Sequence, residues 1–337
     1  MKKLRLYNLM VPIDSGDKAL YRAALRRLGL QREHVRSITL TKRAIDARKG
    51  RVEYNCTADV EIEPRYEDDY LHRWDDFRNI GEVPHLPPLE FPKGKEQPRG
   101  RIVIVGSGPA GLFAAFVLAK QGYRPLLVER GAPADSRLRS IGKFNNAGGP
   151  LLADANAMFG EGGAGTFSDG KLYTRKNKDP HLVNVLKLFV EYGASPDILI
   201  DAAPHIGTDQ LAPVVVAMRK ATEAAGAEIR FHARLDNLEI EAGEVRAAIV
   251  NGERIECAAC IVAIGHSARD TYDMLNERGV SLEARPFQLG VRIEHPQTFI
   301  DEAQYGRHAG EGYRPTHESP KLEMAAGPLP EVADGRA

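Results

Sequence analysis

The sequence predicts an α/β protein built on a parallel sheet, and three observations lead to this class. A short apolar run, 102–105, leads into a glycine pattern at 106–111 and then into residues with helical spacing. A second apolar run, 125–128, follows that helix, so the order is strand, helix, strand. A third run, 260–264, is apolar throughout, which is typical of a strand buried in a parallel sheet.

The glycine pattern, Gly106-x-Gly108-x-x-Gly111, has the spacing of a dinucleotide-binding turn. Gly106 makes the tight turn, Gly108 lets the backbone approach a pyrophosphate, and Gly111 lets helix and strand pack closely. The pyrophosphate would lie at the positive end of a helix that begins near Pro109. Glu129 lies near the offset of about 20 residues at which an acidic side chain binds ribose hydroxyls. The alternative is a glycine-rich turn of another α/β protein, with Glu129 simply solvated.

Composition limits the classes of function. The 337 residues contain 46 Lys and Arg against 46 Asp and Glu, so no overall charge favours nucleic acid or a membrane. No apolar run approaches the roughly 20 residues of a membrane span, and the N-terminus lacks the apolar stretch of a secretory signal. Three cysteines are too few for a disulfide scaffold. We expect a cytoplasmic protein with no membrane partner and no metal site.

Residues 1–81 are expected to form a separate small domain. An alternating strand at 4–10 precedes a helical pattern at 18–30, and two strands, 35–45 and 52–62, follow around a turn. This β-α-β-β order predicts a ferredoxin-like or related α+β module.

Charge is unevenly distributed in this region. Residues 1–52 carry 14 Lys and Arg against 4 Asp and Glu, whereas residues 53–90 carry 3 against 11. Two oppositely charged faces of one domain are the favoured explanation. Nucleic-acid binding through the basic residues 1–52 is the less favoured alternative, because no aromatic stacking motif accompanies them. Residues 82–100 contain five prolines and predict a stiff linker.

A second glycine cluster spans residues 159–171, Phe-Gly-Glu-Gly-Gly-Ala-Gly-Thr-Phe-Ser-Asp-Gly-Lys. So many glycines allow positive φ angles and close approach of the backbone to a phosphate or a flavin edge. The alternative is a flexible surface loop. The remaining expected elements are helices at 181–192 and 211–225, strands at 198–200, 227–232 and 287–294, and a hairpin of 235–241 with 245–251.

Three motifs after the first glycine turn carry a resemblance to a known family: residues 160–171, Pro204-His-Ile-Gly-Thr-Asp209 and Gly265-His-Ser-Ala-Arg-Asp270. Together with the first motif they resemble glutathione-reductase-type FAD flavoproteins. More narrowly they are similar to a bacterial family of FAD-dependent oxidoreductases, or NAD(FAD)-utilising dehydrogenases, with an extra N-terminal module. The resemblance implies a Rossmann-type FAD-binding domain (101–175 and 226–270) with an inserted, incomplete α+β substrate domain (176–225 and 271–305).

The resemblance also implies roles for individual residues. The FAD diphosphate would contact the first motif, the ribose Glu129, and the adenine side Arg130 and the Leu235 backbone. The residues implied at the cofactor are Gly106, Ser107, Gly108, Ala110, Gly111, Glu129, Arg130, Gly162, Gly163, Ala164, Gly165, Thr166, Leu235, Ala263 and Gly265.

Members of that family are longer than this chain, and their returning C-terminal segment supplies further flavin contacts. We therefore expect a C-terminally truncated chain, with a poorly ordered tail at 306–337 that is rich in Gly, Pro and charge. The expected function is hydride transfer between an unknown small-molecule substrate and FAD, with NAD(P)H as a candidate external reductant. The alternative is a truncated non-catalytic remnant, or a protein that binds nucleotides or RNA.

Four residues are candidates for catalysis. Asp169 and Lys171 of the second glycine cluster would lie nearest the flavin ring. His266 would contact diphosphate or substrate, or belong to a polar capping loop. Arg292 would bind an anionic substrate group, although an ordinary surface position is the favoured reading. Cys257 and Cys260 have C-x-x-C spacing, but we expect them on opposite faces of a strand and without redox function.

Overall fold

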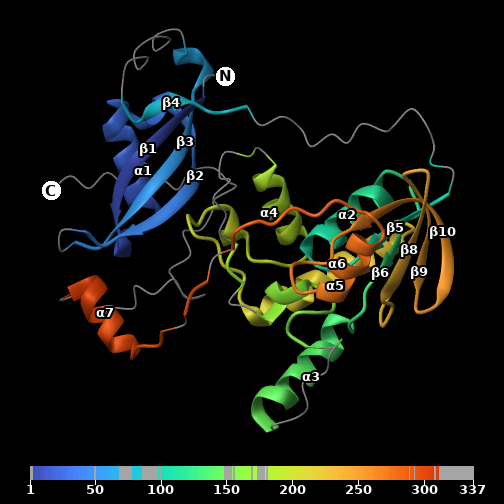
Figure 1. The fold of residues 1–337 in the computed structure, drawn as a ribbon. Coiled ribbons are helices and arrows are strands. Elements are labelled where there is room, and N and C mark those ends of the chain that lie inside the picture. The colour runs from blue at the N-terminus through green and yellow to red at the C-terminus, as the bar shows by residue number, and fades with distance from the viewer. Residues whose placement is uncertain are drawn as a thin grey trace. The chain divides into compact units, whose positions relative to one another are not determined.

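The computed structural model describes residues 3–48, 51–67, 78–85, 98, 100–147, 154, 156–167, 170–172, 179, 181–287, 289–291, 293–306 and 309–310. The chain forms two compact units: Met1–Pro87 with Leu199–Pro204 and Gln288–Ala337, and Pro88–Ile198 with His205–Phe287 (Figure 1). No helix within the described part of the chain is both long enough and apolar enough to cross a bilayer. The finer domain boundaries expected from the sequence stay predictions.

The first unit is built on a four-stranded sheet in the order β2-β3-β1-β4 (Figure 1). Every neighbouring pair is antiparallel. The predicted order of strand, helix, strand, strand is present, and a fourth strand follows it. The ferredoxin-like assignment itself stays a prediction. The elements are β1 Lys3–Pro12, α1 Gly16–Leu28, β2 Val35–Asp46, β3 Glu53–Ile62, β4 Ile80–Glu82 and α7 Gln297–Tyr305, with short 3-10 turns at Ile13–Ser15, Arg32–His34 and Pro64–Tyr66.

Strand β3 shows why this sheet has one apolar face. Its side chains alternate between buried and half-buried positions, as a period of two requires. Tyr54, Cys56, Ala58, Val60 and Ile62 point into a core that α1 covers with Leu20, Ala24 and Leu28.

Several basic residues of the first unit are already paired. Arg5 makes a two-pronged ion pair with Asp59, with nitrogen–oxygen distances of 2.6 and 2.8 Å. Lys3 and Arg36 both approach Glu61 at 3.7 and 3.8 Å. Basic side chains of β1 and β2 therefore pair with acidic side chains of the neighbouring β3. Both the two-face explanation of the charge distribution and nucleic-acid binding by residues 1–52 stay untested.

The segment 199–204 joins the first unit beside β2. The backbone N–H of Arg43 donates to the Ile200 carbonyl at 2.8 Å, and that of Ala202 donates to the Arg43 carbonyl at 2.9 Å. The buried Arg43 side chain pairs with Asp201 at 2.8 Å. The predicted strand at 198–200 is wrong. Residues Pro196–Leu199 form a 3-10 helix (η7), and Asp201 forms only an isolated bridge with Arg43.

The second unit is a six-stranded sheet in the order β7-β6-β5-β10-β9-β8 (Figure 1). The first four strands are parallel, and β8 and β9 form the predicted antiparallel hairpin. The strands are β5 Arg101–Val105, β6 Leu126–Val128, β7 Glu228–Arg230, β8 Leu235–Glu241, β9 Glu244–Val250 and β10 Glu253–Val262. The helices are α2 Pro109–Lys120, α3 Ala134–Ala147, α4 Leu182–Glu191, α5 Thr208–Ala224, α6 Arg269–Glu277 and the 3-10 helix η6 Gly163–Phe167.

Both faces of the parallel strands are covered, which explains their continuous apolar runs. Val103 and Val105 of β5 pack into one core cluster, which includes Leu235 and Leu275. Ile104, between them, points to the opposite face and packs with Leu127 and with Ala115 of α2. The parallel strands predicted at 102–105, 125–128 and 260–264 therefore belong to one sheet, although the last is less buried than expected. Ile261 and Val262 are 37% and 38% exposed.

Two further expectations are wrong. The described residues of 287–294 form no strand, and Phe287, Leu289, Val291 and Ile293 are at least 70% exposed. No described strand pairs with this segment, so its backbone lacks the hydrogen-bonding neighbour that defines a strand. Cys257 and Cys260 share one face of β10, because the register with β5 slips between Cys257 and Ala259 and both sulfurs join the same core cluster.

Candidate dinucleotide-binding site

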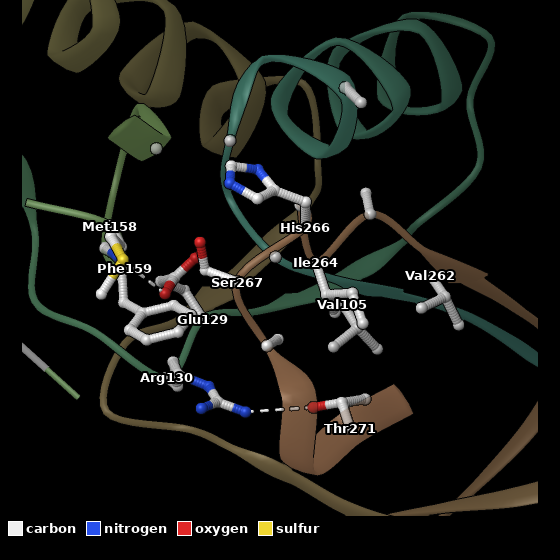
Figure 2. Close-up of a pocket in the computed structure, with 18 of the residues that line it drawn as sticks. Val105, Glu129, Arg130, Met158, Phe159, Val262, Ile264, His266, Ser267 and Thr271 are labelled. Carbon is white, nitrogen blue, oxygen red and sulfur yellow. Dashed lines mark hydrogen bonds between the residues drawn. The ribbon is translucent and has the colours of Figure 1, made fainter. Parts of the chain in front are cut away.

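A cavity of about 370 Å³ lies in the second unit, at the carboxyl ends of β5, β6 and β10 (Figure 2). Ligands of open parallel sheets bind at this edge, and the volume lies within the roughly 300–1,000 Å³ of small-molecule pockets. Of the residues expected at a cofactor, those that line this cavity are Gly106, Gly108, Ala110, Glu129, Arg130, Gly163, Ala164, Leu235, Ala263 and Gly265. Ten of the fifteen residues predicted at a cofactor therefore line one cavity, and their contact with a cofactor stays a prediction.

The first glycine turn is shaped by close backbone contacts. Gly106 has a φ of 98°, and a Cβ there would lie 2.5 Å from the Ala263 carbonyl oxygen. A Cβ on Gly111 would lie 1.8 Å from the Gly106 carbonyl oxygen, so helix α2 can sit on the turn only with glycine at this position. These contacts agree with the roles predicted for both glycines.

The start of α2 fits a phosphate group. Gly108 is the N-cap and offers no side-chain acceptor, and the first helical hydrogen bond runs from Leu112 N to the Gly108 carbonyl at 2.9 Å. The N–H groups of Ala110 and Gly111 therefore precede the helical ladder, where an anion is their natural partner. A Cβ on Gly108 would have the Gly163 Cα at 3.9 Å as its nearest neighbour, so the chain leaves room here for a ligand.

Glu129 has a structural role besides the predicted contact with ribose, because its buried carboxylate accepts hydrogen bonds from three loops. One oxygen accepts the backbone N–H and the hydroxyl of Ser107 at 2.7 and 2.9 Å. The other accepts the N–H groups of Gly131 and Gly160 at 2.8 and 3.0 Å. The carboxylate lines the cavity and also fixes both glycine loops around it. The predicted contact with ribose stays a prediction.

Arg130 closes one wall of the cavity. Its guanidinium lies 4.7 Å from the centre of the Phe159 ring and donates to the Thr271 hydroxyl at 3.0 Å (Figure 2). It also donates to Asp270 at 2.9 Å. Although burial opposes ionisation of Asp270, the hydrogen bond and charge of Arg130 hold the pKa of that carboxyl below its ordinary value. Arg130 thus links the end of β6 to the start of α6 beside Leu235.

The second glycine loop packs directly against the first. Gly162 N donates to the Ser107 carbonyl at 2.9 Å, and a Cβ on Gly163 would lie 3.2 Å from the Gly108 Cα. Of the loop residues predicted near a flavin, Gly163 and Ala164 line the cavity. Gly162 and Thr166 are buried within the loop, and Gly165 is exposed outside the cavity lining.

A buried set of charges that sequence reasoning missed holds this second loop. Arg137 of α3 donates to the carbonyls of Gly163, Asn156 and Ala157 at 3.1, 3.1 and 3.2 Å, and also to that of Glu161. Burial lowers the pKa of Arg137 to about 10, although the carboxylates of Glu129 and Glu161 act to raise it.

Glu161 is the anionic partner in this set, and its side chain is 1% exposed. It accepts Arg219 Nε of α5 at 2.7 Å and the Ala134 N–H, the start of α3, at 2.8 Å. Burial raises the pKa of Glu161, while these two contacts oppose the rise. In the sequence, this set of buried charges is signalled only by the presence of an acidic residue, Glu161, within the second glycine cluster.

The structure describes two of the four catalytic candidates, His266 and Lys171. His266 is exposed and lines the cavity beside Ser267 (Figure 2). Lys171 is exposed and lies outside the cavity lining. Its backbone forms an isolated antiparallel β-bridge with His205. Asp169 and Arg292 lie outside the described residues. Burial raises the pKa of Cys260 to about 12, which disfavours the reactive thiolate.

Two family models match parts of the chain. A model described as an NAD(P)-binding Rossmann-like domain matches residues 104–134, which contain the first glycine turn, α2 and β6. The chain therefore contains a Rossmann-like dinucleotide-binding unit. A domain of unknown function matches residues 3–61, most of the N-terminal sheet.

Comparison with individual proteins extends this likeness. The chain is 38% identical over 331 residues to an uncharacterized protein of Clostridium beijerinckii, across 95% of this chain and 60% of that protein. It is 28% identical over 206 residues to protein FixC of Salmonella typhi, across 59% of this chain and 44% of FixC. It thus spans about half the length of these relatives. The crystal structure of Thermovibrio ammonificans THI4 aligns with a TM-score of 0.37 at 16% identity, over 54% of this chain and 64% of that one.

Proposed function

We propose that the cavity binds the ADP portion of FAD and that this chain is the FAD-binding part of an oxidoreductase. The observation that carries the proposal is the meeting of two glycine loops at the N-terminus of α2. Glu129, the residue after β6, binds both loops, and the end of β10 lines the same cavity. A nucleotide diphosphate fits this cradle, formed by the two glycine loops and the start of α2. The first N–H groups of α2 have no helical hydrogen-bond partner, and the glycines leave space at the backbone.

The rest of the cavity suggests the direction of the ligand. Leu235 and Ala233 supply apolar lining, and Thr271 and Arg130 line the same cavity, which suits an adenine ring. Gly163 packs against Gly108, and Gly163 and Ala164 line the cavity from the second loop. A dinucleotide that extends past its diphosphate would run along this loop, which supports FAD over a mononucleotide.

Oxidoreductase chemistry is proposed from the family resemblance of the motifs together with this site. FAD, when bound, supplies the electron transfer, and the protein supplies binding, orientation and electrostatics. From this chain, the two glycine loops would hold the diphosphate and Glu129 would fix both loops. His266 is exposed at the cavity, and we propose that it contacts an anionic group of the cofactor or the substrate.

The absorption spectrum of the purified protein tests the proposal. After expression with added riboflavin, we expect flavin bands near one equivalent and release of FAD, rather than FMN, on heating. Bleaching of the bands by NADH or NADPH would support an oxidoreductase. A folded, colourless protein that takes up no added FAD would contradict the cofactor assignment.

A further inference from the structure

We infer that Arg137 is a positioning residue that aims the Ala164 N–H of the second glycine loop at the diphosphate of the bound dinucleotide. The inference rests on the proposed function, because it concerns the same cavity. Arg137 itself does not line that cavity and acts through the loop.

Arg137 acts as a clamp that holds four backbone carbonyls in a fixed orientation. Arg137 is 1% exposed, and its two terminal nitrogens reach the carbonyls of Asn156, Ala157, Glu161 and Gly163. A guanidinium presents its donors in a fixed fork, so four carbonyls gathered around one are held in a fixed orientation. The loop thereby gains an internal cation at the point where it approaches the first glycine turn.

The second step follows from peptide geometry. A trans peptide group points its carbonyl and its N–H in opposite directions. The Glu161 carbonyl faces Arg137, and the N–H of the same peptide, Gly162 N, accordingly faces away and donates to the Ser107 carbonyl at 2.9 Å. The first glycine loop is thus the partner on the far side of the clamped peptide.

The same geometry applies one peptide further on. The Gly163 carbonyl faces Arg137 at 3.1 Å, so the Ala164 N–H faces the other way. Ala164 is exposed and lines the cavity, and Gly163 packs against Gly108 and Pro109 at the start of α2. The Ala164 N–H therefore lies on the side where the α2 amides would hold a diphosphate, and it adds a donor from the second loop.

Charge balance keeps this arrangement in place. Glu129 and Glu161 both act electrostatically on Arg137, and Glu161 is itself paired with Arg219. The clamp therefore needs a cation, and a lysine would keep the charge. A lysine ammonium would lose the fork, because a single nitrogen cannot reach four carbonyls that two nitrogens now share.

The test compares ADP with adenosine by calorimetric titration of the full chain. We expect Arg137→Lys to weaken binding of ADP and of FAD about tenfold, the effect of one hydrogen bond to a charged group, and to leave adenosine unchanged. Arg139→Lys is the matched control, because Arg139 lies on the same helix and is exposed. A merely structural role for Arg137 would weaken both ligands equally and would contradict the inference.

A second pair of variants tests the Ala164 N–H itself and leaves the Arg137 side chain unchanged. Ala164→Pro removes the N–H at an exposed position in the first turn of a 3-10 helix, where proline is tolerated, and Ala164→Gly keeps it. We expect only the proline variant to lose ADP affinity. If wild type binds ADP and Ala164→Pro binds it with the same affinity, the inference is overturned but the proposed function is not. If wild type binds neither ADP nor adenosine, the proposed function is overturned as well.

Discussion

Substitution of Gly111 by alanine is expected to lower the free energy of unfolding by about 3 kcal/mol and to abolish dinucleotide binding. The added Cβ would lie 1.8 Å from the Gly106 carbonyl oxygen, which is backbone and cannot rotate away. Helix α2 would have to move off the turn, and the amides at its start would move with it. Urea denaturation and titration with ADP measure the two effects.

Gly142→Ala in α3 is the matched control, because nothing lies within 4 Å of a Cβ at that position. Alanine in an open helical position removes backbone entropy from the unfolded chain, so we expect a gain of about 0.5–1 kcal/mol. Equal stabilities for the two variants would show that α2 does not rest on Gly106 as described.

Replacement of Arg219 by methionine is expected to cost about 3 kcal/mol at pH 7, because it leaves the carboxylate of Glu161 buried without its cation. Methionine keeps most of the side-chain volume, so the loss is mainly one of charge. The double variant Arg219→Met with Glu161→Gln has no uncompensated charge and should recover most of the loss. Chemical denaturation of the three variants against wild type measures these differences.

The loss in Arg219→Met should depend on pH in a stated direction. Burial already raises the folded-state pKa of Glu161 above 4.5, and removal of Arg219 takes away an attraction that lowers it. Between 4.5 and the folded pKa the native state binds more protons than the unfolded state, so stability increases as the pH falls. The deficit relative to wild type should therefore shrink from pH 7 towards pH 5. A deficit that stays constant over this range would contradict a charged, buried Glu161.

The parts that sequence predicted best are those fixed by local pattern. The run before Gly106, the helix after Pro109 and the strand before Glu129 follow from apolar spacing and from glycine geometry, and the structure places them in one parallel sheet. The hairpin around Gly243 follows from the same reasoning, because its φ of 82° suits glycine.

The parts that sequence missed depend on contacts distant along the chain. Arg137, Glu161 and Arg219 come from three separate segments, and no spacing rule connects a buried arginine with carbonyls about 20 residues away. The faces of Cys257 and Cys260 depend on a bulge that the sequence does not signal. The alternation at 287–294 predicted a strand, but the described residues there form none, because a strand also needs a hydrogen-bonding neighbour.

Titration of FAD and ADP into the purified protein tests the central claim most directly, with Gly108→Ala as the paired variant. A methyl group on Gly108 would meet only the Gly163 Cα, at 3.9 Å, so the fold should persist while the cradle for the diphosphate is partly filled. The account predicts saturable binding of both ligands by wild type, and affinity about tenfold weaker in the variant at unchanged stability. Absence of binding by a folded wild type, or equal affinities in the two proteins, would contradict it.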